Sequence, residues 1–173
     1  MLWKKFYLCG RKILVMKTKN SKAYPQKRKT SVFSEAAIAY GASYYTRFIP
    51  KNDWSLVKKA KEGIDTDVFY TFADSIKMPE KFLAAVINLS PRTISNYRDQ
   101  NKSLEANYSE HLLKLISLYE KGKEYLGNID EFNSWLEKPM WGSQDKPIDF
   151  LNTPGGVDLI IARLERMAQG YPL

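Results

Sequence analysis

The residues best suited to chemistry in this chain lie on a short polar segment, Arg92–Asn101, that follows a Ser-Pro dipeptide. Ser90 is a typical N-cap residue and Pro91 a typical first helical residue, so the spacing predicts a helix that begins at Pro91. On this helix Ile94 and Tyr97 are three residues apart and can pack inward, which leaves a polar outer face. Arginine reads guanine and asparagine reads adenine by paired hydrogen bonds, so the outer face favours binding to DNA bases.

The elements around this segment support the same interpretation. The preceding helix ends in Ala-Val-Ile and is followed by the turn Asn88-Leu89-Ser90. Two helices joined by such a turn form a helix-turn-helix, whose second helix enters the major groove. Asp99 would repel phosphate, and a helical hairpin with a solvated polar face remains the alternative. The residues predicted to bind DNA bases or phosphates are Arg92, Thr93, Ser95, Asn96, Arg98 and Lys102.

The apolar pattern predicts an all-α fold from Asp53 onward, because no alternating Val-, Ile- or Thr-rich run favours a strand. Ser34–Tyr45 could form a further short helix that Gly41 weakens. The expected helices and their apolar residues are Asp53–Gly63 with Trp54, Val57 and Ala60; a helix capped by Asp65 or Thr66 with Val68, Phe69, Phe72, Ala73 and Ile76; Glu80–Asn88 with Phe82, Leu83, Val86 and Ile87; a long helix capped by Ser109 with Leu112, Leu115, Ile116 and Tyr119; Asp130–Leu136; and Thr153–Gln169.

Charge is distributed unevenly along the 173 residues, whose net charge is +8. Residues 1–61 contain 15 Lys or Arg and 2 Asp or Glu, a net charge of +13, whereas residues 62–173 contain 12 and 17, a net charge of −5. We interpret residues 1–52 as a basic, flexible arm attracted to nucleic acid, or else as a solvated tail. Within the arm, Met16 is a plausible start, so residues 1–15 are interpreted as an upstream extension of the reading frame.

Catalytic and metal chemistry find little support in the sequence. A lone histidine, His111, near a helix start is expected to be a cap neighbour or a surface residue. One cysteine excludes an internal disulfide and favours the cytoplasm, and no run of about 18 apolar residues predicts a membrane span. Gly155-Gly156 opens a helix that could hold an anion, but no preceding strand or following Lys-Ser/Thr makes it a nucleotide motif. Asp149 and Asp158 are too isolated for a catalytic pair, so no catalytic, cofactor or metal residue is predicted.

The C-terminal third carries three motifs in a fixed order: Trp135-Leu136 before a turn at Gly142, PIDFLNTPGGV over Pro147–Val157, and LERMAQG over Leu164–Gly170. This order and spacing resemble the toxin-binding domain of the Xre/MbcA/ParS-like antitoxins. LSPRTIS, at Leu89–Ser95, resembles that family's entry into its recognition helix. The resemblance covers about residues 54–173. The chain departs from many relatives at Trp141-Gly142-Ser143, where they have Gly-Gly, and at His111, where they carry an arginine.

The resemblance implies a bacterial type II antitoxin. Members of the family are all-helical, dimerise, block a NAD-consuming toxin with a RES domain, and repress their own operon through the helix-turn-helix. The organisation then expected is an arm over residues 1–52, an Xre-like helix-turn-helix domain over 53–127, and a small helical toxin-binding domain over 128–173. The expected partners are a RES-domain toxin, operator DNA and a second copy of the chain, assembled into a larger complex.

The residues predicted to contact the toxin lie at the C-terminal end. Arginine and tyrosine are favoured interface residues, and a segment that follows the Gly170 helix stop can project from its helix. A cleft that binds the pyrophosphate of NAD should also attract cations. The predicted toxin-binding residues are Arg163, Arg166, Tyr171, Pro172 and Leu173. Two alternatives stay open, a stand-alone helix-turn-helix regulator without a toxin and an enzyme that uses the Gly155-Gly156 helix start.

Overall fold

A computed structural model of the chain describes Tyr45 and residues 47–140 and 142–170, all of them within one compact unit, Phe33–Leu173. These residues form α2 (Asp53–Glu62), α3 (Thr66–Ser75), α4 (Glu80–Val86), α5 (Pro91–Asp99), α6 (Ala106–Leu126), α7 (Ile129–Leu136), a 3-10 turn η1 (Pro147–Phe150) and α8 (Pro154–Ala168). Over the described residues the only β-type pairing is an isolated antiparallel bridge between Ile64 and Leu104. The all-α prediction is therefore confirmed. The helix predicted over Ser34–Tyr45 lies outside the described residues, except for Tyr45 itself.

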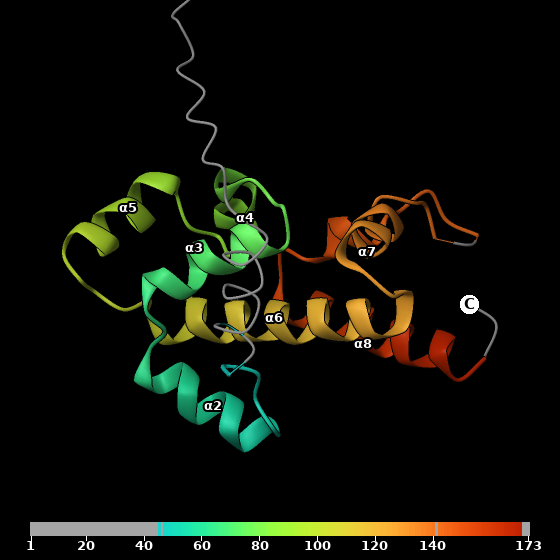
Figure 1. The fold of residues 1–173 in the computed structure, drawn as a ribbon, viewed down its shortest axis with the longest axis horizontal. Coiled ribbons are helices and arrows are strands. Elements are labelled where there is room, and N and C mark those ends of the chain that lie inside the picture. Colours follow the sequence, from blue (N-terminus) through green and yellow to red (C-terminus); the bar gives the residue numbers. More distant parts are fainter. Residues whose placement is uncertain (1–44, 46, 141, 171–173) are drawn as a thin grey trace, which may run out of the picture. The chain divides into compact units, whose positions relative to one another are not determined.

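The longest helix, α6, is the centre of the unit (Figure 1), and α2, α7 and α8 each pack against it. Its predicted apolar residues Leu112, Leu115, Ile116 and Tyr119 are all buried. The helices α3, α4 and α5 pack against one another. Their predicted inward residues Val68, Phe69, Phe72 and Ile94 are buried as well. The helical spacing of apolar residues thus identified most of the core.

Aromatic rings join these two groups of helices. Tyr45, Phe72, Tyr119 and Phe132 pack edge to face in sequence, with ring centroids 5.3, 5.5 and 4.9 Å apart. The chain of rings runs from α3 across α6 to α7. Residues beyond 127 therefore share a core with the predicted helix-turn-helix domain, residues 53–127. The predicted boundary between a DNA-binding domain (53–127) and a toxin-binding domain (128–173) stays a prediction about function. Tyr45 is buried in this core, so the packed body includes a residue of the predicted arm.

Three apolar residues predicted to face inward are exposed. Trp54 and Phe82 have 86% and 40% of their surface accessible, and Val57 is also exposed. In α2 the cause is geometric: steps of three residues advance 300° around a helix, so Trp54, Val57 and Ala60 drift away from one face. Only Ala60 of these three is buried.

The predicted cap at Ser109 is wrong, because α6 begins one turn earlier, at Ala106. Ser109 is fully buried and accepts a hydrogen bond from the Ile64 amide at 3.0 Å while its hydroxyl donates to the Leu104 carbonyl at 3.0 Å. It therefore satisfies backbone groups beside the Ile64–Leu104 bridge. At α3, Asp65 is the N-cap residue, but its carboxylate accepts from the Ser103 hydroxyl instead of capping the helix.

Candidate nucleic-acid interface

The turn between α4 and α5 is built from local capping interactions. Asn88 has a left-handed backbone (φ 59°), which asparagine tolerates better than most residues. The Leu89 amide then donates back to the Ala84 carbonyl at 2.9 Å, which closes the end of α4. Ser90 Oγ accepts from the Thr93 amide at 3.0 Å and Pro91 opens α5. The predicted cap and start of α5 are thus confirmed, and the turn fixes where the second helix begins.

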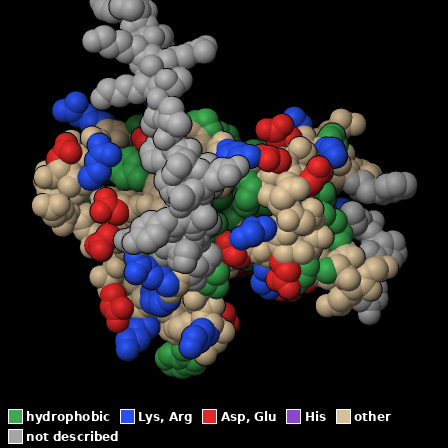
Figure 2. All heavy atoms as spheres, viewed as in Figure 1, with side chains coloured by type: hydrophobic (Ala, Val, Ile, Leu, Met, Phe, Trp, Pro, Cys, Tyr) green, Lys and Arg blue, Asp and Glu red, His purple; other side chains and the backbone are tan. Residues whose placement is uncertain are grey.

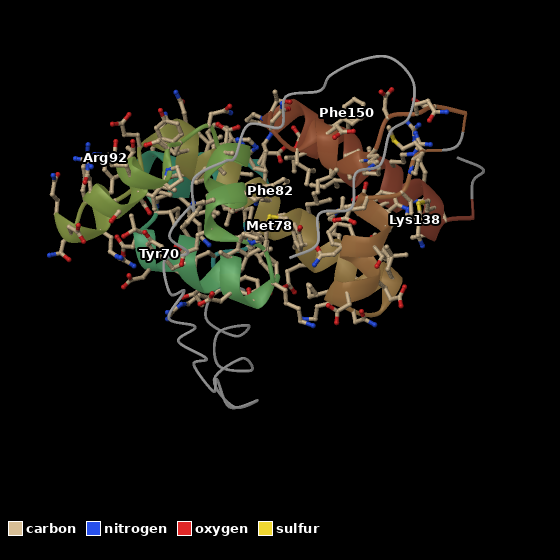
Figure 3. All side chains as sticks on the ribbon, turned by 90° about the horizontal axis from the view of Figure 1, so that it is seen from above. Tyr70, Met78, Phe82, Arg92, Lys138 and Phe150 are labelled. Carbon is tan, nitrogen blue, oxygen red and sulfur yellow. The ribbon has the colours of Figure 1, made fainter. Side chains whose placement is uncertain are left out.

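The base-reading candidates lie on the solvent side of α5. Arg92 and Asn96 are exposed, and neither side chain hydrogen-bonds or pairs with another described residue. Figure 3 shows Arg92 projecting outward from α5. Ile94, on the opposite side, is buried against α3 and α4. Two donor-rich side chains are therefore displayed on a helix whose rotation is fixed by its apolar face.

Among the other residues predicted to bind DNA, Thr93 and Arg98 contact neighbouring side chains of the protein. Thr93 and Ser95 are half-buried, and Thr93 Oγ1 lies 2.7 Å from Ser90 Oγ. The Arg98 guanidinium stacks 4.4 Å from the centre of the Tyr70 ring on α3. Such a cation–π contact positions Arg98 at one edge of α5 and leaves its donors accessible to solvent.

Lys102 is fixed in a small cluster just after α5. Its ammonium lies 4.4 Å from the centre of the Tyr97 ring and 3.5 Å from Glu105, whose carboxylate also accepts from the Tyr97 hydroxyl at 3.0 Å. The charge interaction with the adjacent Tyr97 side chain raises the pKa of Lys102 above its ordinary value. Asp65 and Asp67 line the same hollow as Arg98 and Lys102, which offsets part of the positive charge there.

The described surface is not uniformly basic. On the face in Figure 2, Lys and Arg side chains are interspersed with Asp and Glu side chains. The net charge of −5 over residues 62–173 agrees with this picture. Because phosphate neutralisation supplies much of the affinity for DNA, the folded body would depend on local cations such as Arg92 and on the +13 of residues 1–61.

A second surface with cationic residues lies on α8. Arg166 is exposed and Arg163 is half-buried, with an Nε that no described group hydrogen-bonds. Leu159, four residues before Arg163, exposes 54% of its surface and was not predicted. The spacing 159, 163, 166 places all three on one face, a pattern that the sequence already contained. Tyr171, Pro172 and Leu173 lie outside the described residues.

The opposite side of α8 is anchored to the body. Val157, Ile160 and Leu164 are fully buried, and Thr153 caps the helix by accepting from the Gly156 amide at 3.0 Å. Two ion pairs tie α8 to α6: Lys114 to Asp158 at 2.5 Å, and Lys121 to Glu165. The predicted start of this helix at Thr153-Pro154 is confirmed, and Asp158 has a structural partner.

The residues weighed for catalysis have structural roles. His111 is buried, contrary to expectation, and its Nε2 donates to the Leu151 carbonyl at 2.8 Å. Burial lowers the pKa of His111, so the ring is neutral at pH 7. Asp149 accepts from the Lys146 amide at 3.1 Å within η1. Among the described residues no cluster of three His, Cys, Asp or Glu could hold a metal ion, and none of the helices is long and apolar enough to cross a membrane.

The capped second helix, the tight turn and the outward Arg92 and Asn96 define a helix-turn-helix protein. Residues 55–117 match the family model described as "Antitoxin Xre-like helix-turn-helix domain". An Xre-like antitoxin helix-turn-helix domain therefore occupies this part of the chain, from α2 into α6. No curated protein matches the chain in a sequence search.

Proposed function

We propose that the chain is the antitoxin of a type II toxin–antitoxin pair, that it represses its own operon through α5, and that it blocks a NAD-consuming RES-domain toxin through α8 and residues 170–173. The observation that carries the DNA-binding half is the match of residues 55–117 to an antitoxin helix-turn-helix family. The exposed Arg92 and Asn96 on the capped second helix support it. In this proposal the chain acts as a homodimer in the cytoplasm, without a cofactor or catalytic activity of its own.

The toxin-binding half rests on the C-terminal motifs and on the exposed face of α8. Leu159 adds an apolar contact beside Arg163 and Arg166, and protein interfaces commonly centre on such apolar and arginine residues. The cations suit a cleft that normally binds a pyrophosphate. Because Val157, Ile160 and Leu164 hold the other side of α8 in the core, this face is rigid before any partner arrives.

A stand-alone regulator without a toxin is the second candidate. It is favoured by one observation, that the family match covers the helix-turn-helix and ends at Ser117, before α7 and α8. The neighbouring reading frame discriminates between the candidates: a RES-domain gene beside this one favours the antitoxin, and its absence favours the regulator.

Repression is tested with a reporter gene fused to the region upstream of the chain's own reading frame. The wild type should repress the reporter, and the double variant Arg92→Ala, Asn96→Ala should not. Lys138→Ala, an exposed lysine on the C-terminal side of α7, is the matched control and should repress like the wild type. Equal repression by the double variant would remove α5 from the proposal.

Neutralisation is tested by co-expression with the toxin from the adjacent frame, with cellular NAD as the readout. Deleting residues 170–173 should release NAD consumption while repression of the reporter is retained. The double variant Leu159→Asp, Arg166→Glu replaces an apolar and a cationic residue of the α8 face with acidic ones. It should also release NAD consumption by the toxin. Full protection by both variants at equal expression would show that the toxin is blocked elsewhere.

A further inference from the structure

The two proposed binding helices begin beside a single contact between distant parts of the chain. The Asn88 side chain, in the turn before α5, donates its amide Nδ2 to the Asn152 carbonyl at 3.0 Å. Asn88 lies two residues before Ser90, the N-cap of α5, and Asn152 lies directly before Thr153, the N-cap of α8. The hydrogen bond therefore joins the starts of both helices.

The neighbouring carbonyl is also held, from a different element. The Leu151 carbonyl accepts from His111 Nε2 on α6 at 2.8 Å, and both residues are buried. Consecutive carbonyls at 151 and 152 are thus each bound by a side chain from the helix-turn-helix half. Because Leu151 is held against α6, residues 151–153 have little freedom to move on their own. A movement of Asn88 is therefore expected to move the first turn of α8.

Hydrogen bonds to Thr153 connect residues 151–153 with the first turn of α8. Thr153 Oγ1 accepts from the Gly156 amide at 3.0 Å, and its carbonyl accepts from the Val157 amide at 3.0 Å. Because a helix end depends on its cap, ordering Thr153 should order this turn. Asn88 itself is exposed, so its bond competes with water and is strongest when the turn before α5 is held still.

We propose that Asn88 and His111 are positioning residues that couple the two surfaces: DNA bound at α5 holds the 88–90 turn, strengthens the Asn88–Asn152 bond and stabilises the start of α8. By linkage, a protein whose binding to α8 requires this ordered start then raises the affinity for DNA by the same factor. The coupling rests on the proposed DNA-binding function of α5.

The test is hydrogen–deuterium exchange on the full chain, with and without a duplex of the region upstream of its own reading frame. In the wild type the duplex should slow exchange of the Gly156 and Val157 amides by about two- to twelvefold, the effect of one net hydrogen bond. Asn88→Gly removes the amide but suits the left-handed backbone, so it should fold and bind the duplex while the slowing disappears. Asn101→Gly makes the same backbone change at another left-handed position (φ 51°) without touching Asn152, and should retain the slowing.

Duplex binding is measured on the same samples by fluorescence anisotropy, which separates the outcomes. Binding without slowed exchange in the wild type, or with equal slowing in Asn88→Gly, overturns the coupling and leaves the DNA-binding function intact. Failure of the wild type to bind the duplex overturns the function and the coupling together. Loss of slowing in both glycine variants would assign the effect to the backbone and contradict the role of the Asn88 side chain.

Discussion

Gly155 and Gly156 open α8 side by side, but alanine should act in opposite directions at the two positions. A Cβ at Gly156 would lie 1.9 Å from the Phe150 carbonyl oxygen and 2.9 Å from Thr153 Oγ1, where ordinary contact begins at 3.4 Å. The blocking atom is backbone, so η1 or the start of α8 must move. At Gly155 nothing lies within 4 Å of an added Cβ, and its backbone is not in the left-handed region.

Gly156→Ala should therefore cost at least the upper part of the range for overpacking, about 3 kcal/mol, because a backbone atom yields less readily than a side chain. Gly155→Ala should gain about 0.5–1 kcal/mol, the advantage of alanine over glycine in a helix. For a chain of this size these values correspond to a Tm about 6–12 °C lower and about 1–4 °C higher. Thermal unfolding followed by circular dichroism measures both. A Gly156→Ala variant as stable as Gly155→Ala would refute the close approach of α8 to Phe150.

Three further results are expected. The pKa of His111 is lowered in the folded chain, so the unfolded state binds the proton more readily. The contribution of His111 to the free energy of unfolding is therefore complete above about pH 6.5 and is lost as the pH falls below that value. Urea unfolding should show this loss in the wild type and less of it in His111→Leu. Lys77 has a left-handed backbone (φ 56°) and pairs only at the exposed surface with Asp130, so Lys77→Gly should exceed Lys77→Ala in unfolding free energy by about 1–2 kcal/mol, and equality would show that the backbone there is relaxed. Deleting residues 1–30 should flatten the salt dependence of DNA binding, whereas an unchanged slope would assign their charge to solubility alone.

The helices were predictable where a local rule decides them. Ser90-Pro91 and Thr153-Pro154 each cap a helix as their residue types indicate, and the buried residues of α3 and α6 follow the helical period. Ser109 shows the limit of such rules. A serine near a helix start is a typical cap, but this one is buried beside Ile64, from a different part of the chain. Tertiary packing, which single-sequence patterns do not contain, determined its partner.

The candidate site was predictable in its residue types and less so in their surroundings. Arg92 and Asn96 are exposed as the spacing of Ile94 and Tyr97 indicates. That Arg98 stacks on Tyr70 could not be read from the sequence, because the two residues are brought together only when α3 packs on α5. His111 was misjudged for the same reason: its partner, the Leu151 carbonyl, is 40 residues away.

Sequence-specific recognition by α5 is tested most directly by competition anisotropy with the purified chain. The affinity for the upstream duplex is divided by the affinity for a scrambled duplex of equal length and composition, at one fixed salt concentration. The wild type should prefer its own duplex. Arg92→Ala, Asn96→Ala should lose about 1–3 kcal/mol of that preference for each base contact removed, while its affinity for the scrambled duplex changes far less. An unchanged ratio in the double variant, or no preference in the wild type, would contradict base readout by this helix.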